Sequence, residues 1–306
     1  MNRRQFITAS AGTGLLGLLP GPARAATQAT TAAPRLRPPL VGSQLYGWGQ
    51  YYDRDSQKLS EHMDEVLSAL RDAGYDYAEG TLDVATPDNN ARFAERLKKR
   101  GLKPVSLYTG GAMHVLGKAS ETAEKIAVAA RAAAKAGFAI INVNPDPIGR
   151  DKTDAELIIQ AGALTELGEE LRKSGIRLGI HHHTPELGNG AKEFHSNFTR
   201  CSAGLVGFCY DVHWVYRGGI PPDACLPRYG ERIVSWHLRQ SRNQVWWEDL
   251  DTGDIDYAAV ARFARERRLP AFYTVELAIE PGTQITRSVV ENHARSRAFV
   301  KRVMGA

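Results

Sequence analysis

The sequence predicts an α/β protein folded as a (β/α)8 barrel, the TIM-barrel class. Two observations lead to this prediction: short apolar strand patterns alternate with amphipathic helix patterns, and the alternation repeats eight times. Strands that alternate with helices pair in parallel, because each helix carries the chain back to the start of the sheet. The repeats begin near residue 40 and fill the length of about 250 residues that such a barrel needs. We therefore expect one barrel domain over residues 40–306.

Eight apolar segments carry the strand pattern. In chain order they are 41–48, 75–80, 103–109, 139–144, 177–183, 206–214, 233–240 and 271–277. Helix patterns fit between them, and a last helix fits residues 285–303. A doubly wound sheet is the alternative, but it normally carries a glycine-rich phosphate loop after its first strand, and GSQLYGWGQYYDRD is not one.

Four junctions between a helix and the next strand share one composition. Each helix pattern has lysine or arginine near its end and is followed by a glycine, at Gly74, Gly101, Gly137 and Gly175. Positive side chains suit the negative end of a helix. Glycine is favoured because it adopts the left-handed conformation that ends a helix.

The first residues follow a different pattern. Arg3 and Arg4 precede an apolar segment rich in glycine and alanine, and Ala-Arg-Ala at 23–25 has the form of a cleavage site. Residues 1–25 are therefore predicted to be a twin-arginine signal peptide, and residues 26–39 a disordered leader. This prediction implies a periplasmic or secreted protein. The apolar segment is too short and too rich in glycine to be a good membrane span, and we expect no association with a membrane after cleavage.

The net charge argues against polyanionic partners. The formal charge is +5, and three of these positive charges lie in the predicted signal peptide. The remaining chain carries about +2, which is too little to predict binding to nucleic acid or to an anionic membrane. The sequence is compatible with a homo-oligomer and does not define the oligomeric state.

Polar side chains follow the predicted strands at their carboxyl ends, where the active sites of such barrels lie. They are Glu79, Asn142, Asn144, His181, His182, His183, Asp211, His213, His237, Arg239 and Glu276, with Glu186 just beyond the fifth strand. Buried ionisable groups are costly unless they are paired or bind a metal. Their convergence therefore predicts a functional site at this end of the barrel.

Alternation along the fifth strand separates its three histidines. His181 and His183 share the side that faces the lumen, and His182 takes the other side. We expect His182 to be structural and to face the wall of the barrel. We expect His181 and His183 to be part of the functional site.

Alternation along the sixth and seventh strands adds four inward-facing residues. Asp211 pairs with His213, and His237 pairs with Arg239. Asp211 precedes WVYRGG, which we expect to be a loop, so a role as a helix cap is disfavoured. With Glu186 and Glu276 at the strand ends, this set suits a hard divalent ion. Mn²⁺ is the first expectation, and Mg²⁺, Co²⁺ and Zn²⁺ are the alternatives.

Five motifs resemble the xylose isomerase-like superfamily, also described as sugar phosphate isomerases/epimerases. They are VGSQLYG, GIHHHTPE, CYDVHWVYRGG, SWHLRQ and YTVEL, and the resemblance covers most of residues 40–303. It implies a divalent ion held by Glu186, Asp211, His237 and Glu276. Many members place the first ligand glutamate where this chain has His181, so either His181 or Glu186 is the ligand from the fifth strand.

The resemblance also implies an isomerase or epimerase that removes a proton next to a carbonyl, through an enediolate. The expected catalytic residues are His183, His181, Arg239 and His213. His183 or His181 is the first choice of base, and Glu276 or Glu186 is the second. Predicted export and the lack of a phosphate loop favour a non-phosphorylated carbohydrate substrate.

Three other functions are weighed against this one. A lyase or hydratase that acts on 3-keto-glycosides by β-elimination would use the same residues. A metal-dependent nuclease is disfavoured by the low charge and the predicted export. A non-catalytic periplasmic sugar-binding protein would not require an aspartate, a histidine and a glutamate on three successive strands.

Overall fold

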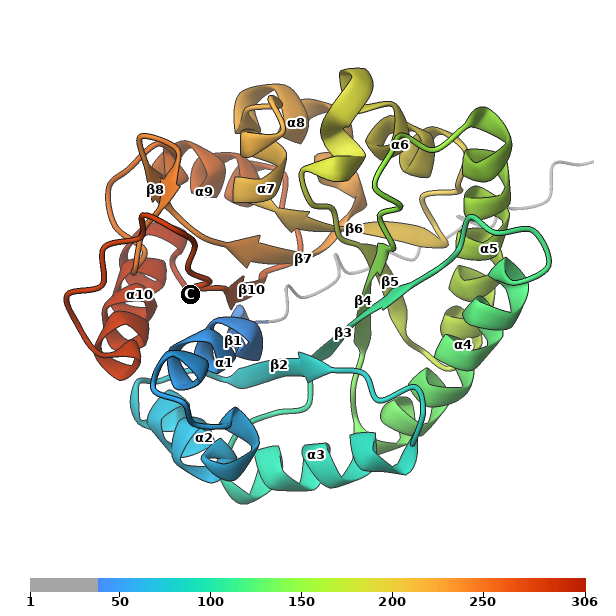
Figure 1. Ribbon diagram of the computed structural model, residues 1–306. Coiled ribbons are helices and arrows are strands. Elements are labelled where there is room, and N and C mark those ends of the chain that lie inside the picture. The colour runs from blue at the N-terminus through green and yellow to red at the C-terminus, as the bar shows by residue number, and fades with distance from the viewer. Residues whose placement is uncertain (1–37) are drawn as a thin grey trace, which may run out of the picture. The chain divides into compact units, whose positions relative to one another are not determined.

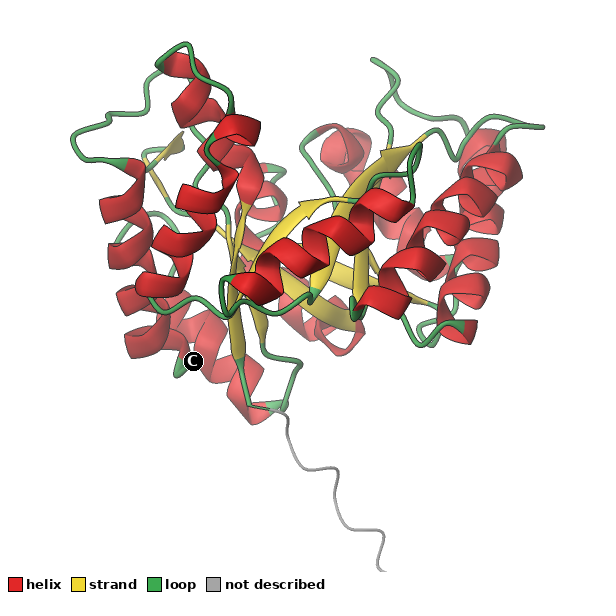
Figure 2. Cartoon of the chain, turned by 90° about the horizontal axis from the view of Figure 1, so that it is seen from below, coloured by secondary structure: helices red, strands yellow, loops and turns green. Residues whose placement is uncertain are grey.

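The computed structural model describes residues 38–306. The predicted signal peptide and almost all of the predicted leader lie outside the described residues. Eight parallel strands close into a barrel in the order β1-β10-β7-β6-β5-β4-β3-β2, and helices surround it (Figures 1 and 2). The predicted (β/α)8 barrel is therefore confirmed. None of the described helices has the length and apolar character to cross a membrane.

Each barrel strand overlaps one predicted strand. The strands are β1 (Leu40–Gln44), β2 (Tyr77–Thr81), β3 (Ser106–Gly111), β4 (Ile140–Pro145), β5 (Arg177–Ile180), β6 (Val206–Asp211), β7 (Ile233–Leu238) and β10 (Phe272–Val275). The helices are α1 (Leu45–Arg54), α2 (Met63–Asp72), α3 (Asp88–Lys99), α4 (Ala119–Ala136), α5 (Asp154–Lys173), α6 (Gly188–Thr199), α7 (Val212–Arg217), α8 (Pro222–Tyr229), α9 (Tyr257–Glu266) and α10 (Val289–Met304). Short elements complete the chain: the 3-10 turns η1 (Leu59–Glu61), η2 (Pro185–Leu187) and η3 (Gly230–Arg232), and a hairpin of β8 (Ser241–Arg242) and β9 (Val245–Trp246).

The first predicted strand is too long, because its second half is helical. Strand β1 ends at Gln44, whose side chain accepts a hydrogen bond from the backbone N–H of Tyr46 and so caps α1. Gly47 then lies against the end of the neighbouring strand, where an added Cβ would come within 2.4 Å of the carbonyl oxygen of Leu277. The cap and this close approach start a helix where the sequence pattern suggests a continuing strand.

The sixth predicted strand is also too long, and the expected loop after Asp211 is wrong. Strand β6 ends at Asp211, and helix α7 begins at the next residue. The Oδ1 atom of Asp211 accepts a hydrogen bond from the backbone N–H of Trp214 at 2.8 Å, so Asp211 does cap a helix. As a consequence, His213 lies on a helix and does not share the inward face of Asp211.

The four junction glycines adopt the conformation that favours glycine there. Their φ angles are 85° at Gly74, 77° at Gly101, 112° at Gly137 and 73° at Gly175. Residues other than glycine rarely adopt these angles. The helix ends read from the sequence are therefore confirmed at the backbone level.

A hydrogen-bonded polar layer lies in the barrel beneath the strand ends. Ser106 and Asn142 both donate to Glu79, at 2.6 and 2.8 Å, and Ser235 donates to Asn142 at 2.9 Å. Gly179 leaves the room for this layer, because an added Cβ would lie 2.5 Å from Oδ1 of Asn142. This layer fixes Glu79 from below and forms the floor of the site.

Candidate active site

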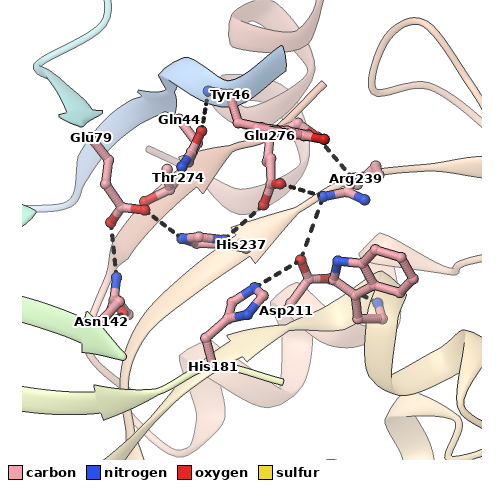
Figure 3. Close-up of polar contacts among 12 residues, drawn as sticks. Gln44, Tyr46, Glu79, Asn142, His181, Asp211, His237, Arg239, Thr274 and Glu276 are labelled. Atoms are coloured by element: carbon pink, nitrogen blue, oxygen red, sulfur yellow. Dashed lines mark hydrogen bonds and ion pairs between the residues drawn. The ribbon is translucent and has the colours of Figure 1, made fainter. Parts of the chain in front are cut away.

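Four buried side chains converge at the carboxyl ends of β5, β6, β7 and β10. They are His181, Asp211, His237 and Glu276, here called the ligand cluster. Each offers one atom that could bind a metal, and these four atoms lie within 4.8 Å of one another. Figure 3 shows the four side chains pointing toward a common centre. The structure therefore brings His181, and not Glu186, together with the other three predicted ligands.

His237 lies between two carboxylates. Its Nδ1 atom is 2.8 Å from Oε2 of Glu276, and its Nε2 atom is 2.8 Å from Oε1 of Glu79 (Figure 3). Burial disfavours a charged imidazolium, but the contacts with Cys209, Glu79 and Glu276 outweigh it, so the pKa of His237 is raised well above its usual value. Glu79 thereby orients His237 toward the centre of the cluster.

His181 has a similar pair of partners. Its Nδ1 atom lies 3.2 Å from Oδ1 of Asn144, and its Nε2 atom lies 3.4 Å from Oδ2 of Asp211. Because Oδ1 of Asp211 is occupied by the cap of α7, Oδ2 is the oxygen that faces the cluster. One residue thus ends the strand and supplies an anion to the site.

Arg239 is the cation beside the cluster. Its Nη2 atom lies 2.7 Å from Oε1 of Glu276 and 3.7 Å from Oδ2 of Asp211, and its guanidinium carbon lies 4.1 Å from the ring centre of Trp246. Burial raises the pKa of Asp211 and Glu276, but Arg239 and the neighbouring histidines outweigh it, and both pKa values are lowered. Both side chains therefore remain anionic despite their burial.

Glu186 lies outside the ligand cluster. It is on η2, where it accepts hydrogen bonds from the backbone N–H of His183 at 2.7 Å and from Nδ2 of Asn144 at 3.2 Å. Burial raises its pKa to about 7. Because Asn144 contacts both Glu186 and His181, Glu186 supports the cluster through Asn144 and through the backbone of His183.

The histidines expected to be catalytic have separate positions. His183 lines the cavity, and its ring centre lies 4.7 Å from that of His181. Burial lowers its pKa to about 3. His213 does not line the cavity. It is buried on α7, and neither ring nitrogen has a hydrogen-bond partner among residues 38–306. The start of α7 rotates His213 away from the site.

His182 faces the outer layer, as alternation predicts. Its ring centre lies 4.6, 5.4 and 5.8 Å from those of Phe194, Phe198 and Phe208. Asn197 is hydrogen-bonded to its Nε2 atom at 3.1 Å. His182 therefore anchors the end of β5 to the helix layer.

An open cavity of about 800 Å³ lies over the ligand cluster. One wall carries the charged and imidazole groups Glu79, His181, His183, His237, Arg239 and Glu276. Sequence reasoning missed Tyr108, which lies in the middle of β3 and lines the cavity. It also missed the part of the cavity wall that α1 supplies, because residues 45–48 were expected to be a strand. Only the position of Tyr108 near the end of the predicted strand 103–109 could have pointed to it.

The residues of the cluster fit a divalent cation. Each histidine presents one ring nitrogen to the cluster and holds an oxygen atom with the other, which is how ligand histidines are usually oriented. The site holds three buried carboxylates, Glu79, Asp211 and Glu276, and one guanidinium, which pairs with the last two, so a divalent ion with neutral histidines would balance the charge. Two nitrogens and two carboxylate oxygens are a common donor set for such ions.

The chain matches the family described as Xylose isomerase-like TIM barrel over residues 67–300. It resembles a sugar phosphate isomerase/epimerase from Parabacteroides distasonis with a TM-score of 0.68 and 21% identity, covering 88% of this chain and 96% of that one. For an L-ribulose 3-epimerase the values are 0.69, 18%, 87% and 94%. For a 3-keto-D-glucoside 4-epimerase from E. coli they are 0.64, 14%, 86% and 98%.

No curated protein matches the sequence. At these identities, the similarity to solved structures shows the fold alone. The family match is independent of it and spans β2 to α10, including the whole ligand cluster. The chain therefore belongs to the xylose isomerase-like TIM-barrel family.

Proposed function

We propose that this protein is a divalent-metal-dependent enzyme of the isomerase or epimerase type. It would move a proton at the carbon next to a carbonyl of a non-phosphorylated carbohydrate. The observation that carries the proposal is the buried ligand cluster of His181, Asp211, His237 and Glu276 beneath an open cavity. The three solved structures named above, which are sugar isomerases or epimerases by description, support this class of reaction.

The four residues of the cluster would hold the metal. When bound, the ion would act as a Lewis acid that stabilises negative charge on the carbonyl oxygen while the neighbouring carbon loses its proton. Two histidine nitrogens favour Mn²⁺, Co²⁺ or Zn²⁺ over Mg²⁺, which prefers oxygen ligands, and Mn²⁺ is our first choice.

The protein's own groups divide the remaining work. His183 lines the cavity beside the cluster without belonging to it, so its ring is the first candidate to accept the proton from carbon. Arg239 also lines the cavity, and its Nη1 atom has no hydrogen-bond acceptor among residues 38–306. We assign this N–H group to a hydroxyl or to the developing oxyanion of the substrate. The carboxylates of Glu79 and Glu276 are the alternative bases.

The cavity favours an uncharged substrate. Arg239 is the only lysine or arginine among the residues that line it within the described chain, and it is already paired with Glu276. A phosphate group normally needs several donors or cations. The predicted export, which rests on the sequence pattern alone, agrees with a substrate outside the cytoplasm.

Exchange with solvent deuterium tests this function. The protein is loaded with Mn²⁺ and incubated in D₂O with ketoses and with keto-glycosides, which carry the carbonyl on a ring carbon. Incorporation of deuterium at carbon is followed by mass spectrometry. We expect exchange that stops when the metal is removed and falls strongly in His183→Gln. No exchange into any of these sugars by a metal-loaded wild type would contradict the proposal.

A further inference from the structure

A second wall of the cavity is apolar. It is formed by the start of α1, by η1, by the first residue of α2 and by the second turn of α3. Its members are Leu45, Tyr46, Leu59, Met63 and Phe93, here called the apolar wall. Tyr46 is 58% exposed, although it is a large aromatic residue. An exposed apolar surface continuous with a polar site commonly marks a ligand-binding groove.

The apolar wall is held firmly in place. Gln50 on α1 donates to the carbonyl of Ile279 at 2.9 Å and accepts from the N–H of Ile279 at 2.8 Å. Trp48 stacks on His293 of α10 with a centroid distance of 4.4 Å, and its indole N–H donates to Ser43. The part of the wall that α1 supplies is therefore fixed to α10 and to the segment that follows β10.

The size of the cavity exceeds the needs of one sugar ring. Its volume of about 800 Å³ lies in the upper part of the range of about 300–1000 Å³ that holds drug-sized ligands. A single sugar ring engaged by the ligand cluster would leave the apolar wall in contact with water. The remaining space therefore suits a second, non-reacting part of the substrate.

The chemistry of the wall selects that second part. A second sugar ring carries hydroxyl groups that need polar partners when they are buried. Besides Glu79, the polar residues that line the cavity from β1, β2 and α1 are Gln44, Gln50, Asp53 and Thr81, and the amides of Gln44 and Gln50 are already hydrogen-bonded to backbone groups. Two aromatic rings, two leucines and a methionine suit a planar hydrocarbon ring better.

We propose that the apolar wall is a subsite for an aromatic aglycone, so that the substrate is an aryl glycoside. This inference rests on the proposed function for the reacting sugar. A glycosidic bond blocks the anomeric carbon, so the ring cannot open to release a carbonyl there. The carbonyl next to which the proton is removed must then be on a ring carbon. The substrate class is an aryl keto-glycoside, and the preceding reaction must oxidise a ring hydroxyl.

Calorimetric titration tests the subsite without turnover. The Mn²⁺-loaded protein is titrated with phenyl glucoside, methyl glucoside and cellobiose, the glucosides as both anomers. We expect one phenyl glucoside to bind about tenfold more tightly than its methyl counterpart and than cellobiose. Tyr46→Ala and Met63→Ala should reduce this preference several-fold and leave the methyl glucoside unaffected. Leu116→Ala is the matched control, because Leu116 is 82% exposed and does not line the cavity.

Three results would overturn the subsite: no detectable binding of either phenyl glucoside, equal affinity for phenyl and methyl, or cellobiose binding as tightly as phenyl. The outcome is separable from that of the proposed function. Deuterium exchange into a methyl keto-glucoside without any phenyl preference would keep the function and reject the subsite. A phenyl preference in a protein that binds no metal would keep the subsite and contradict the function.

Discussion

The two sides of the barrel mouth differ in the kind of residue that they contribute. Strands β5, β6, β7 and β10 supply the ligand cluster and Arg239, all of them buried and paired with one another. The side formed by α1, η1, α2 and α3 supplies the apolar wall and no member of the cluster. We propose that one side carries out the chemistry and that the other side selects the substrate. Changes on one side should therefore leave the function of the other side intact.

The largest expected effect comes from Asp211→Asn. Asparagine caps a helix as well as aspartate does, so α7 should persist and the free energy of unfolding should change by about 1 kcal/mol or less. The cluster loses one of its anions, so we expect metal binding to weaken strongly and deuterium exchange to fall about a thousandfold. Thermal unfolding, metal titration and exchange check the three parts. A variant that folds and exchanges like the wild type would show that Asp211 is only a cap.

Glu79→Gln should have the next largest effect. Its carboxylate holds Nε2 of His237 from the polar layer below, and loss of such support typically lowers metal affinity about 10- to 100-fold. Competition with a chelator measures this affinity. Ser68→Ala is the control variant and should bind metal like the wild type, because Ser68 lies on α2 and donates only to a backbone carbonyl there. Unchanged affinity in Glu79→Gln would remove Glu79 from the support of the site.

Gly47→Ala should disturb the apolar side more than the ligand cluster. The added Cβ would come within 2.4 Å of the backbone oxygen of Leu277, so we expect a loss of about 1–3 kcal/mol in unfolding free energy and a displaced α1. Preference for phenyl over methyl glucoside should fall, while metal affinity stays. Gly49→Ala is the matched control on the same helix, because its nearest contact would be Leu59 at 3.9 Å. Equal stability of the two variants would contradict the close approach of α1 to the backbone of Leu277.

A smaller effect concerns acid stability on the α1 side. Burial lowers the pKa of His293 to about 4, against about 6.5 in an unfolded chain. Between pH 6.5 and pH 4 the unfolded state binds a proton at His293 and the folded state does not, so the free energy of unfolding decreases as the pH is lowered. His293 accounts for about 2 kcal/mol of the loss between pH 7 and pH 5. His293→Phe should remove that share in urea unfolding at the two pH values. An unchanged pH dependence would contradict it.

The sequence was sufficient for features that depend on period and on backbone chemistry. Alternation separated His182 from its neighbours correctly, because the inward and outward sides continue for three residues beyond the end of β5. The junction glycines were readable because positive φ has a strong residue preference. Apolar runs likewise located every barrel strand to within a few residues at its start.

The sequence failed where a helix begins directly at the end of a strand. Gln44 is not a preferred capping residue, and Asp211, which is one, follows a buried apolar strand and was assigned to the site instead. Both errors had consequences for the site. They hid the apolar wall and placed His213 on the inward face. The choice between His181 and Glu186 depends on three-dimensional contacts: Nε2 of His181 lies beside Asp211, whereas Glu186 accepts a hydrogen bond from the backbone N–H of His183.

The metal content of the purified protein tests the central claim most directly. Wild type, Asp211→Ala/His237→Ala, His181→Ala and Glu186→Gln are each reconstituted with Mn²⁺, Co²⁺ or Zn²⁺, dialysed and measured by mass spectrometry, with circular dichroism to confirm folding. We predict about one ion per chain in wild type and in Glu186→Gln, none in the double variant, and a strong loss in His181→Ala. A folded wild type that takes up none of the three metals would contradict the account. Loss in Glu186→Gln with retention in His181→Ala would instead make Glu186 the fourth ligand.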